Sequence, residues 1–116
     1  MRMLICLVAL TIAVAAQEEI LRPGNGVTLP QVVKQVTAQY TQEARDARIE
    51  GTAVVTAVVK ADGTVGDVKI ERSLDRTYGL DQAALDATKQ WVFKPATRDG
   101  KAVAVFVAIE HSFTLK

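Results

Sequence analysis

The sequence contains very few of the residues on which metal binding, disulfide bonding and much of enzyme catalysis depend. Among its 116 residues there is one cysteine, Cys6, and one histidine, His111. A structural zinc site uses four ligands of these types and a disulfide uses two cysteines. The composition therefore excludes both within one chain, and it predicts no cofactor and no enzyme.

Aromatic residues and charge of one sign are also scarce. Aromatics make up 5% of the chain, and 14 basic residues stand against 13 acidic ones. A near-neutral chain with no basic run lacks the electrostatic footprint of a nucleic-acid-binding or membrane-surface protein. The apolar fraction of 49% is typical of a folded chain. With so few aromatics, the core should consist of Val, Ala, Ile and Leu, a palette that favours a sheet with small-residue helices.

The amino terminus has the order of a secretory signal peptide. A basic residue, Arg2, precedes an apolar run that ends in the small residues Ala13-Val14-Ala15, and polar Gln17 follows at once. The run of about 13 residues is shorter than the roughly 20 that span a bilayer. We therefore predict a signal peptide over residues 1–16 and a periplasmic protein. The alternative is a segment retained as an inner-membrane anchor.

The next part, residues 17–36, predicts a flexible lead-in because it contains Pro23, Gly24 and Gly26. Within it, 29–36 favours a short strand or an extended arm. A short helix is expected over 41–48 with Thr41 as its N-cap, and Gly51 as the glycine that ends it.

Two strands joined by a tight turn come next. Residues 52–60 are β-branched and apolar on both faces, as in a central strand. Asp62-Gly63 is a strong hairpin signal, and 65–73 forms the returning strand. Val65 and Val68 are out of phase with Gly66 between them, which predicts a bulge there.

A second helix and a long strand complete the pattern. The helix is expected from Leu80-Asp81, with Asp81 as N-cap, to Gln90 or Trp91, and Pro95 prevents its continuation. Residues 102–115 alternate, which predicts one core-facing side. The fold class is therefore α+β, a three-stranded antiparallel sheet with two helices packed on one face, over residues 37–116.

Several short motifs in this region, taken in order, resemble the C-terminal domain of the TonB family. They cover about two thirds of the chain, and their order and spacing carry the resemblance. The motifs are Glu50-Gly51-x-x-Val54, Asp62-Gly63-x-Val65, Ala83-Ala84-Leu85 followed by Trp91-x-Phe93-x-Pro95, Gly100-Lys101-x-Val103, and Phe113-x-Leu115.

The resemblance implies a protein-binding domain. In the TonB family the last strand receives a short segment of an outer-membrane transporter by strand addition, helped by residues before the first helix. Energy-coupling members also carry a long anchor and spacer, whereas the lead-in here is short, so we expect binding more than force transmission. The matching positions here are Val103, Val105, Val107 and Ile109, with Thr37, Gln39 and Tyr40.

Other readings of these residues remain open at the sequence level. The last strand can instead pair with residues 29–36 or with a second copy in a homodimer, making the chain a self-associating structural module. A retained anchor would instead make it an energy transducer for transmembrane transport. Trp91 is expected in the core with Phe93, although an aromatic can also anchor a partner.

The titratable residues have simple structural readings. Glu43, Asp46 and Glu50 are interleaved with basic residues, as on a solvated helix face. Asp62 and Asp99 each precede a glycine in a turn. His111 is expected to be half-buried near the end of the sheet, with a pH switch as the less favoured reading.

Overall fold

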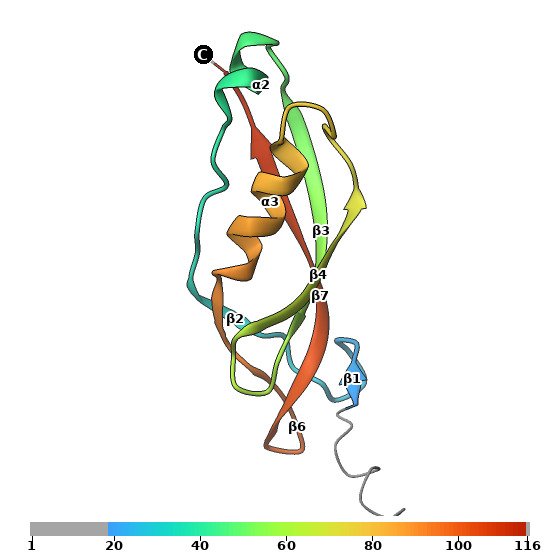
Figure 1. Ribbon diagram of the computed structural model, residues 1–116. Coiled ribbons are helices and arrows are strands. Elements are labelled where there is room, and N and C mark those ends of the chain that lie inside the picture. The colour runs from blue at the N-terminus through green and yellow to red at the C-terminus, as the bar shows by residue number, and fades with distance from the viewer. Residues whose placement is uncertain (1–18, 116) are drawn as a thin grey trace, which may run out of the picture.

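The computed structural model describes residues 19–115, which form an α+β fold with a curled sheet (Figure 1). The predicted signal peptide lies outside the described residues. Within residues 19–115, none of the helices has both the length and the apolar character needed to span a bilayer. The elements are β1 Ile20–Leu21, β2 Gln31–Lys34, α2 Gln42–Asp46, β3 Gly51–Val59, β4 Val65–Arg72, α3 Leu80–Lys89, β5 Val92–Lys94, β6 Ala96–Arg98 and β7 Lys101–Phe113.

The predicted three-stranded antiparallel sheet is confirmed as the centre of a larger one. The strand order is β1-β7-β3-β4, and β3 pairs with β7 without interruption from Gly51↔Phe113 to Val59↔Val105. Strand β1 adds to β7 in parallel, and β6 pairs with the start of β7. Strands β2 and β5 form a separate two-stranded sheet. These four strands are too short to show a two-residue period, which is why the sequence did not predict most of them.

The β3–β4 hairpin closes as its turn residues predict. The Asp62 carboxylate accepts hydrogen bonds from both the backbone N–H (3.0 Å) and the hydroxyl (2.6 Å) of Thr64. These bonds lower the pKa of Asp62. Gly63 has a φ of +90°, which favours glycine. The register shifts between Ala57↔Val68 and Val59↔Val65, so the predicted bulge near Gly66 is confirmed.

The N-cap predicted for the second helix is wrong. The cap of α3 is Gly79, with a φ of +94° and no side-chain hydrogen bond, and Asp81 lies in the first turn. The capping role passes to Asp75, whose carboxylate accepts the backbone N–H of Leu80 at 3.1 Å. Asp81 instead holds the preceding loop, because it accepts the N–H groups of Leu74 (2.9 Å) and Asp75 (3.0 Å).

Both carboxylates of this loop are buried, yet they are held in the ionised form. Burial by itself would raise the pKa values of Asp75 and Asp81. The backbone N–H groups that they accept, with the Ser73 hydroxyl on Asp81, outweigh burial, and both pKa values are lowered. The pair is therefore a structural brace for the loop between β4 and α3.

Two other helix-end predictions differ from the structure. Helix α2 has the predicted Thr41 N-cap, whose hydroxyl accepts the Ala44 N–H at 3.1 Å, but it ends at Asp46. Gly51 opens β3 instead of ending the helix, because Arg48 takes the left-handed conformation, with a φ of +59°. Helix α3 ends at Lys89, and Pro95 separates β5 from β6 instead of stopping a helix.

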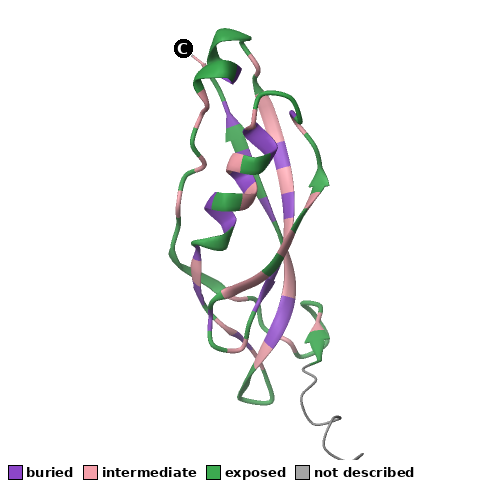
Figure 2. Cartoon of the chain, viewed as in Figure 1, coloured by how far each residue is buried: buried purple, intermediate pink, exposed green. Residues whose placement is uncertain are grey.

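The core lies between α3 and the sheet, with a second part under β5 and β6 (Figure 2). Ala84 of α3 packs against Ala53 and Val55 of β3. Helix α2 packs at one end, where Ala44 meets Leu80 and Phe113. The largest cluster surrounds the N-terminal half of β7. It consists of Val59, Trp91, Phe93, Ala96, Val105 and Ile109.

Candidate functional site: an open strand edge

The edge of β7 that faces away from β3 is only partly covered. At its start, Ala104 and Val105 pair with β1. Beyond Val105 no described strand pairs with this edge. An unpaired edge presents a row of N–H and C=O groups to another chain.

The β3–β7 register shows which residues of β7 offer these groups. The Lys60 N–H donates to the Thr64 carbonyl (2.8 Å) and the Lys60 carbonyl accepts from Gly63 (2.8 Å), so the backbone of Lys60 is directed to the β4 side. Backbone direction alternates along a strand. Val59, Ala57 and Val55 are therefore directed to β7, and their partners there are directed back to β3; these partners are Val105, Val107 and Ile109.

The residues between those partners turn their backbone groups outward. They are Phe106, Ala108 and Glu110, and we name Phe106–Glu110 the open edge of β7. The positions matched from the family resemblance are therefore offset by one residue from the outward backbone groups. Val103, Val105, Val107 and Ile109 belong to the core-facing side, where Val105 is fully buried and Ile109 is 8% exposed.

An apolar groove of about 590 Å³ lies beside the open edge. One wall is the open edge of β7, and the other comes from residues around β2 and β5. Leu29 and Val32, which are exposed to 68% and 50%, contribute apolar surface to this second wall. The remaining lining residues are Pro23, Pro30, Trp91 and Phe93.

The opposite edge of the sheet, formed by β4, is protected against strand addition. Its solvent-exposed side chains include Asp67, Lys69, Glu71 and Arg72. Its pairing with β3 is interrupted by two register shifts. Charged residues and bulges are the usual means by which proteins keep an edge from pairing. The open edge of β7 has one charged residue, Glu110, and no bulge in its pairing with β3.

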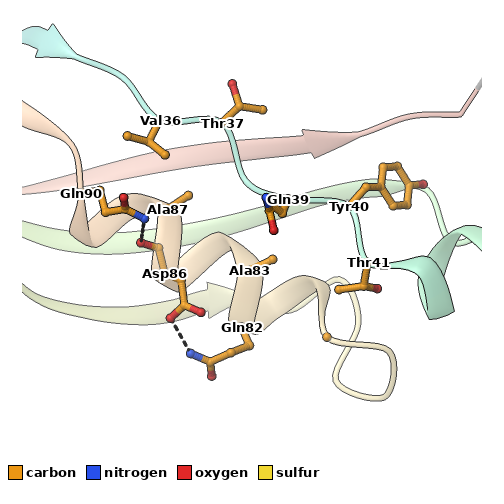
Figure 3. Close-up of a pocket in the computed structure, with 11 residues that line it drawn as sticks. Val36, Thr37, Gln39, Tyr40, Thr41, Gln82, Ala83, Asp86, Ala87 and Gln90 are labelled. Carbon is orange, nitrogen blue, oxygen red and sulfur yellow. Dashed lines mark hydrogen bonds between the residues drawn. The ribbon is translucent and has the colours of Figure 1, made fainter.

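The three sequence-predicted residues before the first helix have different surroundings. Tyr40 is held in the fold: its hydroxyl donates to the Ile49 carbonyl, and its ring meets the Phe113 ring edge-on at 5.5 Å. Thr37 and Gln39 are exposed. Both belong to the lining of a second groove of about 660 Å³, which lies between this segment and α3 (Figure 3).

The segment that carries Thr37 and Gln39 is attached to the core by Trp91. The indole Nε1–H donates to the Val36 carbonyl at 2.8 Å, and the Trp91 side chain is 9% exposed. A narrow cavity of about 130 Å³ separates residues 35–38 from Glu110, His111 and Ser112 of β7. This segment therefore bounds the far end of the open edge.

His111 is more deeply buried than its position near the sheet end predicts, at 6% exposure. The Thr88 hydroxyl donates its single hydrogen to the Ala84 carbonyl (2.8 Å), so His111 Nε2 is the donor in its 2.7 Å bond to Thr88 Oγ1. Burial lowers the pKa of His111, which keeps the ring neutral at pH 7. These contacts give it a structural role.

The acidic and histidine side chains of residues 19–115 do not gather into a metal site. The structure brings together no three acidic, histidine or cysteine side chains able to hold a metal ion within that range. Glu50 is engaged structurally, since its carboxylate accepts the Leu115 N–H at 2.9 Å. The chemistry that the site offers is backbone hydrogen bonding beside an apolar groove.

These features define a small α+β domain with one protected and one open sheet edge. The chain belongs to the family described as Gram-negative bacterial TonB protein C-terminal, whose model matches residues 36–115. The resemblance and the fold class predicted from the sequence are thereby confirmed.

Curated relatives and a solved structure agree with this assignment. Protein TonB of Xanthomonas campestris pv. campestris is 34% identical over 77 residues, covering 66% of this chain and 34% of the relative. Protein TonB of Vibrio cholerae is 38% identical over 85 residues, covering 73% and 34%. The match thus spans about a third of these relatives' length. The solution NMR structure of the Pseudomonas aeruginosa TonB CTD has a TM-score of 0.62 at 21% identity, covering 81% of this chain and 91% of that one, and it shows the same fold.

Proposed function

We propose that this domain binds an extended segment of an envelope protein, and that the segment adds as a strand to the open edge of β7. The observation that carries the proposal is the contrast between the two sheet edges. The β4 edge is charged and bulged, whereas Phe106–Glu110 is mostly apolar and lies beside an apolar groove. In strand addition, backbone bonds supply affinity and alternate side chains supply selectivity.

Membership of the TonB C-terminal family supports an outer-membrane TonB-dependent transporter as the source of that segment. We place the domain in the periplasm, where such a segment is accessible. Binding, not catalysis, is its proposed activity. Thr37 and Gln39 line the second groove and are proposed to contact the parts of the partner that extend beyond the open edge.

A proline at the open edge tests this proposal. Ala108→Pro removes an N–H that faces outward, so the β3–β7 hydrogen bonds remain and the domain is expected to stay folded. Loss of one backbone bond, together with the proline ring in the path of the added strand, should lower capture of the transporter segment about tenfold or more. Capture is measured by photo-cross-linking from a reactive residue at Glu110, with mass spectrometry of the adduct.

Ala108→Val is the matched control, because it keeps the N–H and favours a strand. It should retain capture. Equal cross-linking by folded Ala108→Pro and Ala108→Val would contradict strand addition. If the same edge instead pairs with a second copy, light scattering will show a dimer that Ala108→Pro abolishes.

A further inference from the structure

The chain places a strand of its own on the edge assigned to the partner. Strand β1 lies on the β7 side away from β3, with Ile20 opposite Ala104 and Leu21 opposite Val105. Because Val105 is directed to β3, the Leu21–Val105 pairing runs through the N–H of Phe106, so β1 reaches the start of the open edge. What β1 indicates about the partner therefore depends on the proposed function, which is strand addition at the open edge of β7.

Four side chains of this segment show what the edge accepts. Leu21 packs against the largest core cluster, and Ile20 lines a hollow with Phe106 on the opposite face of the sheet. The Arg22 guanidinium lies over the Phe106 ring, 5.0 Å from its centroid. Glu19 forms an ion pair with Arg98 at 3.8 Å. The segment that occupies this part of the edge therefore consists of an acidic residue, two aliphatic residues and a basic residue, and it runs parallel to β7.

The attachment of β1 is weak compared with that of the chain that follows it. Its pairing involves two residues, and Ile20 remains 38% exposed. The ion pair between Glu19 and Arg98 is exposed on both sides, and such pairs contribute little. By contrast, Thr28 is fixed to Thr97 of β6 by two 2.9 Å hydrogen bonds with the backbone of Thr97.

A turn with unusual backbone conformations separates the weakly attached strand β1 from Thr28, which is fixed to β6. Gly24, Asn25 and Gly26 have φ values of +106°, +52° and +88°. A Cβ added at either glycine would meet nothing within 4 Å, so the turn is not packed against the body. Rotation within this turn can lift β1 from β7 while Thr28 stays in place.

We propose that β1 is an internal occupant of the partner edge, and that a partner segment of the same chemistry displaces it. The displacing segment has an acidic residue followed by two aliphatic residues, and it runs parallel to β7. Displacement extends the available edge from Phe106–Glu110 to Ala104–Glu110. Residue Leu21 marks the position that an aliphatic side chain of the partner fills.

The test compares binding of a synthetic peptide with the sequence of residues 19–23, capped at both ends, to the unaltered chain and to Leu21→Asp. The new carboxylate cannot pack against the core cluster, so β1 leaves the edge in the variant. If β1 occupies the edge in about nine molecules of ten, its release strengthens binding about tenfold. NMR titration gives the affinity and, through the shifts of distant amides, the state of the fold. Glu19→Gln is the matched control, because it removes only the exposed ion pair, and it should bind like the unaltered chain.

Binding that is at least several-fold tighter to Leu21→Asp, with shifts at Ala104–Phe106, supports the proposal. Equal affinity for all three chains, or no binding to Leu21→Asp, overturns it. If the peptide shows no binding while a transporter segment still cross-links at Glu110 and Ala108→Pro blocks that cross-link, the proposed function stands. In that case only the role of β1 as an internal occupant is rejected. If neither experiment shows binding, both proposals fail.

Discussion

Gly63→Ala is expected to destabilise the domain by about 3 kcal/mol or more. Gly63 has a φ of +90°, and a Cβ built there would lie 2.1 Å from the backbone oxygen of Phe93. That oxygen cannot move freely, because the Phe93 N–H also donates to the Gly63 carbonyl at 2.8 Å. Any shift therefore separates the β3–β4 turn from β5, which forms part of the groove wall. Thermal unfolding should show a midpoint lowered by more than about 10 °C.

Gly100→Ala is the control for backbone strain alone. Gly100 also has a positive φ, +78°, but a Cβ there would meet nothing within 4 Å. Its expected loss is about 1 kcal/mol. Equal losses in the two variants would show that contact with Phe93 is not what requires a glycine at position 63.

Trp91→Ala should cost about 3–5 kcal/mol and also weaken partner capture. The side chain fills the largest core cluster, and its indole N–H holds the Val36 carbonyl at 2.8 Å. Its removal leaves a cavity beneath the groove and releases residues 35–38, which bound the open edge. Urea unfolding followed by far-UV circular dichroism measures the loss, since Trp91 is the only tryptophan and its fluorescence is absent from the variant.

Trp91→Phe separates the two roles. It keeps an aromatic ring in the cluster but removes the hydrogen bond to Val36, with an expected loss of about 1 kcal/mol. Its capture of the partner should fall less than that of Trp91→Ala. If Trp91→Ala were as stable as Trp91→Phe, the core role of Trp91 would be rejected.

The sequence predicted the parts of the fold that repeat over many residues. The long alternation after Lys101 and the Asp62-Gly63 turn identified β7 and the hairpin, because side-chain burial imposes a two-residue period on a strand. Elements held by distant partners were not predictable in this way. Strand β1 exists through its pairing with Ala104 and Val105, and β5 through its pairing with β2.

The sequence predicted which strand carries the candidate site, but not which residues of that strand direct their backbone groups outward. Alternation shows that the side chains of Val105, Val107 and Ile109 face the core, whereas the family resemblance proposed these same residues as partner-binding positions. The direction of a backbone N–H depends on the register with β3, which no pattern within one strand reveals. In the same way, Asp81 fits the sequence rule for an N-cap, but the left-handed Gly79 starts the helix two residues earlier.

Amide hydrogen exchange of β7 with and without the bound partner segment tests the central claim most directly. In the free domain, the N–H groups of Val107 and Ile109 should exchange slowly because they face β3, and those of Ala108 and Glu110 should exchange fast. Binding by strand addition should slow exchange at these two outward positions and leave Val107 and Ile109 unchanged. Protection that appeared along α3 while the two outward amides stayed fast would contradict strand addition at β7.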